Sequence, residues 1–148
     1  YTSNKFIKKI DNHYFDTDGN KENLTFVLKV SKILKLKNNL LLKSLKNFKG
    51  LSFRQEIIHN SKFLKVINDS KATSFSSSEK LLRSIKNIYW IMGGLPKKGD
   101  KFLLKKNDCK NIKLYIFGQN QNFFINQLKN KMEFQSFLNL KTLMAKIF

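Results

Sequence analysis

Residues 88–94 read IYWIMGG and residues 112–118 read IKLYIFG, and these two stretches decide the fold of the chain. Each is a mostly apolar run that ends in glycine and is followed by polar loop residues and then by a helical pattern. Strands that are apolar on both faces and alternate with helices are typical of a parallel sheet covered by helices. The sequence therefore predicts an α/β fold with a mostly parallel sheet.

Two helices are predicted upstream of these strands. Side chains recur at helical spacing from residue 20 to residue 34, and one face is predicted to hold Leu24, Val27, Leu28, Ser31 and Leu34. A second helix is predicted from residue 38 to about residue 48, and Gly50 after it suits the left-handed backbone conformation that ends helices. We expect the two helices to pack as an αα-hairpin.

Short strands are predicted on both sides of this helical hairpin. Residues 5–7 and 13–15 should form a short β-hairpin before it. Residues 53–59 and 63–67 should form a second hairpin after it, and a further helix should begin within residues 76–79. The order of elements is then a helical part followed by an α/β part.

The composition of the chain limits its function. The 148 residues carry 29 Lys+Arg against 10 Asp+Glu, a net charge of +19, and 41% are hydrophobic, which excludes a disordered basic tail. No apolar run approaches the ~18 residues of a membrane-spanning helix. Only Arg54 and Arg83 are arginines, so the planar fork that favours base reading is nearly absent. Two explanations of the lysines stay open: A/T-rich codon bias, which also accounts for the many Asn, Ile and Phe residues, or a functional basic face.

Three loops are candidates for a binding site. Ligands of parallel α/β sheets bind at the carboxyl ends of the strands, which points to the loops after Ile67, Met92 and Phe117. The first loop combines a carboxylate, an ammonium group and hydroxyls: Asp69 could accept hydrogen bonds from a ribose, and Lys71 with Thr73 could hold an anion. The same residues would also suit a simple capped turn before a helix.

Other common catalytic arrangements are not found in the sequence. His13 and His59 have neither helical spacing nor cysteine partners, so a His/Cys metal site is not expected. Cys109 is the single cysteine, which excludes an internal disulfide and fits a reducing compartment. The glycine-rich loop from Gly93 to Asp100 is not a Walker sequence, although Lys97 or Lys98 could clamp a carboxylate or phosphate there.

Several segments, in the right order, resemble motifs of the Mur ligase family. Residues 68–73 read NDSKAT and match the signature of the D-glutamate-adding branch outright. Residues 48–56, FKGLSFRQE, are similar to the family linker Phe-x-Gly-Leu-Pro-His-Arg-x-Glu, and residues 19–23, GNKEN, to the end of its Gly-x-His-Asn-x-x-Asn motif. Residues 91–100 resemble the Gly-Gly-x-x-Lys loop, and residues 114–118 the strand that follows it. The chain departs from the family at Gly19, where the family has His, and at residues 52–53, Ser-Phe in place of Pro-His.

The resemblance implies a fold and an activity. Residues 1–50 would be the end of the central ATP-binding domain, and residues 51–148 most of the Rossmann-like C-terminal domain that binds the amino acid. The family joins an amino acid to a nucleotide-linked muramyl carboxylate through an acyl phosphate, using ATP and Mg²⁺. This chain would belong to a ligase that adds D-glutamate to UDP-N-acetylmuramoyl-L-alanine in peptidoglycan precursor synthesis, and so serve cell-wall growth, cell shape and division.

The resemblance also implies roles for individual residues. Asn23, Arg54 and Asp69 would bind the nucleotide, at its adenine side, its phosphate and its ribose respectively. Lys71 would be the catalytic residue that orients the reacting groups. Thr73 and Lys97 would engage D-glutamate, with Lys98 as the alternative to Lys97.

Further expectations concern what lies outside these residues. The P-loop, the muramyl-nucleotide domain and the magnesium ligands of the family are not found in residues 1–148, so we expect a piece cut at both ends and inactive alone. A cytoplasmic monomer without nucleic-acid or membrane partners is expected. The alternative is a basic α/β module that binds RNA. The ligase hypothesis predicts that Arg54, Asp69, Lys71 and Lys97 converge on one cleft, whereas RNA binding predicts a continuous lysine face with exposed aromatic residues.

Overall fold

A computed structural model describes residue 6 and residues 8–147 of the chain. Residues 5 and 7 of the first predicted strand lie outside the described residues. The chain divides into two compact units between Lys71 and Ala72. The hairpin of residues 56–68 belongs to the first compact unit, and the predicted domains 1–50 and 51–148 stay a prediction.

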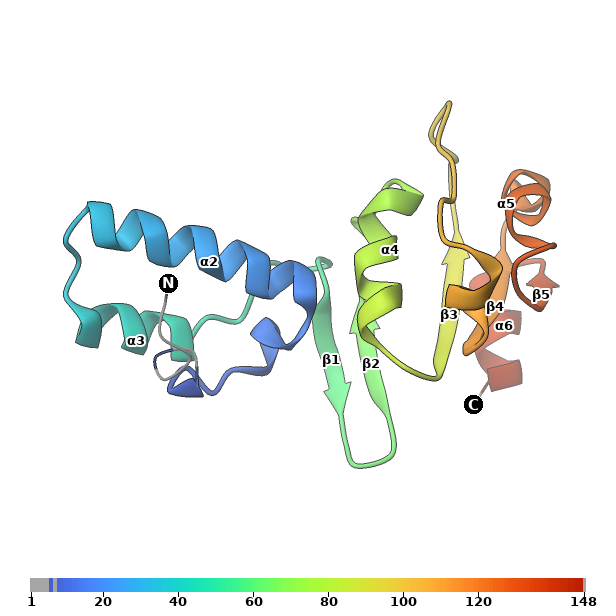
Figure 1. The fold of residues 1–148 in the computed structure, drawn as a ribbon. Helices are drawn as coiled ribbons and strands as arrows, with labels where there is room; N and C mark the ends of the chain where they lie inside the picture. Colours follow the sequence, from blue (N-terminus) through green and yellow to red (C-terminus); the bar gives the residue numbers. More distant parts are fainter. Residues whose placement is uncertain (1–5, 7, 148) are drawn as a thin grey trace. The chain divides into compact units, whose positions relative to one another are not determined.

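The first unit contains a helical hairpin. Its elements are a 3₁₀ turn η1 (His13–Asp16), helix α2 (Asp18–Ile33) and helix α3 (Asn38–Lys46). The predicted αα-hairpin is therefore confirmed, and Figure 1 shows α2 and α3 running side by side. Ile10, Leu24, Leu28 and Leu45 form the buried core between them.

The predicted strand at residues 13–15 is wrong, because these residues form the turn η1. The Asn12 side chain accepts a hydrogen bond from the Tyr14 N–H at 3.0 Å and so caps this turn. Its amide nitrogen also donates to the carbonyl oxygens of Leu45 and Phe48, each at 2.8 Å. These bonds tie the segment to the end of α3 rather than to a partner strand.

The buried face of α2 confirms the prediction in part. It contains the predicted Leu24, Leu28 and Ser31 together with Asn20, whereas the predicted Val27 and Leu34 are 45% and 64% exposed. Beside it an uncovered apolar strip of α2 consists of Phe26, Val27, Val30, Ile33 and Leu34. Val27 and Leu34 thus have helical spacing but belong to this strip and not to the core.

A two-stranded antiparallel sheet completes the first unit. Strand β1 (Glu56–Asn60) pairs with β2 (Lys65–Asn68), with a register shift between Ile57 and His59. The predicted hairpin is confirmed. Within the described residues β2 pairs with β1 alone and is not a strand of the parallel sheet, so the prediction that the loop after Ile67 follows a parallel strand is wrong.

The second unit is the predicted parallel α/β layer. Its sheet has the order β3-β4-β5, all parallel, formed by Ile88–Gly93, Ile112–Phe117 and Phe134–Phe137. The helical elements are α4 (Phe75–Ser84), the 3₁₀ turn η2 (Lys106–Cys109), α5 (Gln121–Leu128) and α6 (Leu140–Ile147). This arrangement confirms the α/β class and is consistent with a Rossmann-like domain.

The central strand β4 anchors the core of this unit. Leu114 and Ile116 are 1% and 0% exposed and pack with buried residues of α4 and α5. Phe75 at the start of α4 contacts the rings of Phe102 and Phe124 in edge-to-face geometry. This packing fixes the carboxyl ends of β3 and β4, where the glycine-rich loops begin.

None of the helices in the described part of the chain is long and apolar enough to cross a membrane.

Candidate functional site

The linker between α3 and β1 contains Gly50, which has a φ of +78°. A side chain at this position would be strained in the left-handed conformation. A Cβ atom would in addition lie 2.6 Å from Cδ2 of Tyr14, too close for any real contact. The glycine of the linker motif is therefore required by the fold, because the chain turns against the Tyr14 ring.

Two non-glycine residues of the same linker also have left-handed backbone. Phe53 has a φ of 66° and Gln55 a φ of 48°, so the two flank Arg54 in the sequence. Left-handed backbone costs about 1–2 kcal/mol for an L-residue and persists only where the surroundings hold it. The Phe53 N–H donates to Oε2 of Glu56 at 2.9 Å, and the Lys71 N–H donates to the Phe53 carbonyl oxygen at 3.1 Å. These bonds hold the linker against the loop after β2.

Asp69 is hydrogen-bonded to this linker, and its two carboxylate oxygens have different surroundings. Oδ1 accepts a hydrogen bond from the Gln55 N–H at 3.1 Å. Oδ2 is buried and has no hydrogen-bond partner among the described residues. Burial raises the pKa of the Asp69 carboxyl, while the Gln55 hydrogen bond and the charge of Arg54 lower it. A buried acceptor without a partner costs about 1–3 kcal/mol, so this oxygen fits a donor supplied by a ligand.

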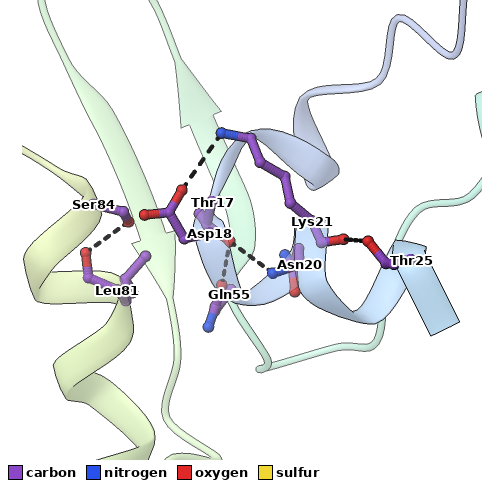
Figure 2. A network of polar contacts seen from close by, with 8 residues as sticks. All are labelled: Thr17, Asp18, Asn20, Lys21, Thr25, Gln55, Leu81 and Ser84. Carbon is purple, nitrogen blue, oxygen red and sulfur yellow. Dashed lines mark hydrogen bonds and ion pairs between the residues drawn. The ribbon is translucent and has the colours of Figure 1, made fainter. Parts of the chain in front are cut away.

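A network of polar contacts joins the linker to the first turn of α2 (Figure 2). The Thr17 hydroxyl donates to Oε1 of Gln55 at 2.8 Å and accepts a hydrogen bond from the Asn20 N–H at 3.4 Å. The Asn20 side chain is buried and donates to the Tyr14 carbonyl oxygen at 2.7 Å. Thr17 is thus both the N-cap of α2 and a fixed point for the Gln55 side chain.

Three of the predicted site residues gather around the linker. Arg54 and Asp69 are close enough for the arginine charge to lower the Asp69 pKa. Lys71 is exposed, and its Nζ lies 5.8 Å from the centroid of the Phe53 ring. Asn23 is exposed on α2.

The two remaining predicted residues lie in the second unit. Thr73 and Lys97 are both exposed. The Asp100 N–H donates to the Lys97 carbonyl oxygen at 3.1 Å and closes the glycine-rich loop. Asp100 Oδ2 accepts a hydrogen bond from the N–H of Phe75, two residues after Thr73, at 2.7 Å. One carboxylate therefore links the loop of Lys97 to the segment of Thr73.

Two glycines with left-handed backbone follow the carboxyl ends of the parallel strands β3 and β4. Gly94 and Gly118 have φ values of +103° and +92°, with no atom close to where a Cβ would stand. The Asn120 side chain donates to the Gly94 carbonyl oxygen at 3.2 Å and connects the loops after β3 and β4. The loops after Met92 and Phe117 thus follow the carboxyl ends of parallel strands, as predicted, and their role in binding a ligand stays a prediction.

Sequence reasoning missed the supporting residues Thr17, Gln55, Asp100 and Asn120. Asn120 could have been found, since it follows β4 at the predicted edge of the sheet. Gln55 and Thr17 are 38 residues apart, and no local pattern points to their contact. The prediction that Arg54, Asp69, Lys71 and Lys97 share one cleft stays a prediction, because Lys97 belongs to the other unit.

An open hollow of the second unit stands apart from the predicted site. It lies at the amino ends of β4 and β5 and is lined by several lysines and by Glu133, and none of the predicted site residues lines it. Among the described residues, no three His, Cys, Asp or Glu side chains lie where they could hold a metal ion.

Comparison with known proteins gives a consistent result. No family model matches the chain. It is 33% identical over 144 residues to the UDP-N-acetylmuramoylalanine–D-glutamate ligase of Wolbachia pipientis wMel, which is 93% of this chain and 28% of that protein. The enzymes of the same name from Rickettsia prowazekii and Francisella tularensis are 35% and 33% identical, over 78% and 94% of this chain.

The chain spans only 28%, 26% and 34% of the length of these three relatives. The three relatives are all named as D-glutamate ligases, and they match between 78% and 94% of this chain. The resemblance to the Mur ligase family is thereby confirmed.

Proposed function

Because this chain is similar to Mur ligases, we propose that it is part of an ATP-dependent ligase that adds D-glutamate to UDP-N-acetylmuramoyl-L-alanine. The observation that carries the proposal is the match to D-glutamate ligases over 93% of the chain. The intact NDSKAT sequence at residues 68–73 lies inside the site described above and supports it. By itself the 148-residue chain is expected to be inactive.

The linker offers groups suited to a nucleotide. ATP supplies the phosphoryl group that activates the substrate carboxylate. Asp69 would accept a hydrogen bond from a ribose hydroxyl, since its buried Oδ2 has no partner among the described residues. Arg54 would hold phosphate through its planar fork, and Asn23 would contact the adenine side. Residues outside this chain would hold the Mg²⁺ ion.

The remaining predicted residues suit the two other substrates. D-Glutamate carries two carboxylates, so a hydroxyl at Thr73 and an ammonium group at Lys97 or Lys98 are complementary to it. Lys71 would orient the carboxylate of UDP-N-acetylmuramoyl-L-alanine and the phosphate being transferred. A cytoplasmic monomer acting in peptidoglycan precursor synthesis follows from this assignment.

The first experiment is to recover the whole reading frame and search upstream for a Gly-x-x-Gly-Lys-Ser/Thr P-loop. The encoded protein should release phosphate from ATP only when both UDP-N-acetylmuramoyl-L-alanine and D-glutamate are present. L-Glutamate should not replace D-glutamate. A reading frame without a P-loop, or phosphate release that does not depend on D-glutamate, would refute the proposal.

Variants test the assigned residues in that full-length protein. Lys71→Ala should lower the turnover rate by at least about tenfold, as expected when a positioning charge is removed from a transition state. Lys65→Ala is the matched control, because Lys65 is an exposed lysine on the neighbouring strand β2. Equal activity of the two variants would contradict the role of Lys71.

A further inference from the structure

The Asp69 carboxylate accepts one hydrogen bond in the described part of the chain, and the charge of Arg54 acts on it as well. Its Oδ1 accepts a hydrogen bond from the Gln55 N–H, and its Oδ2 has no partner among the described residues. The direction in which Oδ2 points is therefore set largely by where the Gln55 N–H lies.

Gln55 itself is held in an unfavourable backbone conformation. Its φ of 48° is one that glycine adopts more easily. The side chain compensates for this, because its Oε1 accepts a 2.8 Å hydrogen bond from the Thr17 hydroxyl. Gln55 thus contributes through two groups at once, with its N–H on Asp69 and its side chain on Thr17.

Thr17 is a suitable anchor for this contact. Its oxygen accepts a hydrogen bond from the Asn20 N–H, so its own proton is available to Gln55. As the N-cap of α2 it is fixed to a helix whose next turns are packed in the core through Leu24 and Leu28. The Gln55 side chain is therefore held in place by a helix that is packed in the core.

We infer that Gln55 and Thr17 are positioning residues that hold the Asp69 carboxylate ready to accept a hydrogen bond from a ribose hydroxyl of the nucleotide. The inference rests on the proposed function for its ligand. It adds that binding of the nucleoside is coupled to the cap of α2, through residues 17, 55 and 69.

The test uses the full 148-residue chain and two measurements. The first is the pKa of the Asp69 carboxyl, followed by NMR of its ¹³Cγ signal and assigned with Asp69→Asn. The second is the dissociation constant of adenosine, compared with that of 2′,3′-dideoxyadenosine, which has no ribose hydroxyls to offer.

Four variants separate positioning from folding. Thr17→Val removes the hydroxyl, and Thr17→Ser restores it. Gln55→Leu removes the side-chain acceptor but leaves the helix cap of Thr17 intact, so it controls for loss of the cap. Gln55→Gly keeps the N–H and relieves the backbone strain, so a purely local role would leave Asp69 unaffected. Retained amide spectra of α2 identify the variants that fold.

Without its tether the Gln55 N–H should leave Asp69, and the pKa of that carboxyl should rise further. We expect this rise in Thr17→Val, Gln55→Leu and Gln55→Gly, and recovery in Thr17→Ser. Adenosine should bind about three- to tenfold more weakly to Thr17→Val, Gln55→Leu and Gln55→Gly than to the parent chain, which is the effect of losing one hydrogen bond. Binding of 2′,3′-dideoxyadenosine should not change among them.

The outcomes distinguish this inference from the function on which it rests. If the Asp69 pKa responds as described but no variant or parent chain binds adenosine, the positioning role stands and the nucleotide proposal fails. If the pKa is the same in Thr17→Val, Gln55→Leu and Gln55→Gly as in the parent chain, the inference is wrong, whatever the chain binds.

Discussion

Replacing Gly50 with alanine should destabilise the first compact unit strongly, because two separate costs fall on the same methyl group. The backbone at Gly50 has a φ of +78°, and the new Cβ would overlap the ring of Tyr14. Tyr14 cannot easily move aside, since its ring contacts both Phe15 and Phe48 in edge-to-face geometry.

The magnitude follows from adding these costs. A left-handed conformation costs an L-residue about 1–2 kcal/mol. Forcing extra volume into a packed contact typically costs a further 1–3 kcal/mol, so about 2–5 kcal/mol should be lost from the free energy of unfolding. A loss of that size is a large part of the stability of a small unit.

The assay is urea unfolding of the 148-residue chain, followed through the amide resonances of α2 for the first unit, which holds Gly50, and of β4 for the second unit, which holds Gly99. Gly99→Ala is the matched control: Gly99 has a φ of +77°, but no atom lies near the place of its Cβ. It should cost only the ~1–2 kcal/mol of the backbone term. In a Tyr14→Ala background the cost of Gly50→Ala should fall to about the same value, since the clash is gone. The reasoning is refuted if Gly50→Ala costs no more than Gly99→Ala, or costs as much with the Tyr14 ring absent as with it present.

Three further predictions use the same chain. Burial raises the pKa of the Asp69 carboxyl, so folding disfavours its ionised form, and the chain loses stability as the pH rises from below the ordinary value of 3.8 through the raised folded-state pKa. Asp69→Asn should therefore unfold at a higher urea concentration than the parent chain at pH 7 and at the same concentration at pH 3, and equal midpoints at both pH values would contradict this. Asp100→Ala should lower the free energy of unfolding of the second unit by about 1 kcal/mol, because it removes the acceptor of the Phe75 N–H at the start of α4. An unchanged urea midpoint, followed by the fluorescence of the single tryptophan, would contradict this. Burial, and secondarily the charge of Asp108, raise the pKa of the Cys109 thiol. The native chain at pH 8 should therefore react with a thiol reagent at least about tenfold more slowly than the urea-unfolded chain. Equal rates would show that the thiol is accessible in the native chain.

The parallel strands were predictable because they are unusually apolar. Residues 88–93 and 112–117 carry enough apolar side chains to be buried on both faces, and few other structures suit such runs. Strand β5 (Phe134–Phe137) was missed, since it has four residues, is largely exposed and reads FQSF. It is a strand because β4 offers it backbone hydrogen bonds, and that contact is not encoded in its own composition.

Errors near the N-terminus have a similar physical cause. The aromatic residues of His13–Asp16 favour a strand by propensity, but the hydrogen bonds of Asn12 to the end of α3 impose a turn. Helical periodicity found α2, yet it could not tell the face with Leu24 from the strip with Val27. Which of two apolar faces becomes the core depends on the partner helix.

Of the candidate site, the sequence revealed the residues that carry charge but not those that place them. Asp69, Arg54 and Lys71 lie in recognisable motifs. The contacts of Gln55 with Thr17 and Asp69 are hydrogen bonds between distant segments, and they leave Oδ2 of Asp69 without a partner in the described part of the chain. Such bonds follow from tertiary structure, so only the structure could supply them.

The uncovered apolar strip of α2 has a consequence for the behaviour of the chain in solution. Phe26, Val30 and Ile33 are 61%, 53% and 77% exposed, and a surface of this kind promotes self-association. The net charge of +19 opposes it by keeping copies apart. Salt shortens the reach of that repulsion from about 10 Å at 0.1 M to about 3 Å at 1 M, while leaving apolar attraction in place. Colloidal stability should therefore fall as ionic strength rises, the reverse of the familiar salting-in of weakly charged proteins.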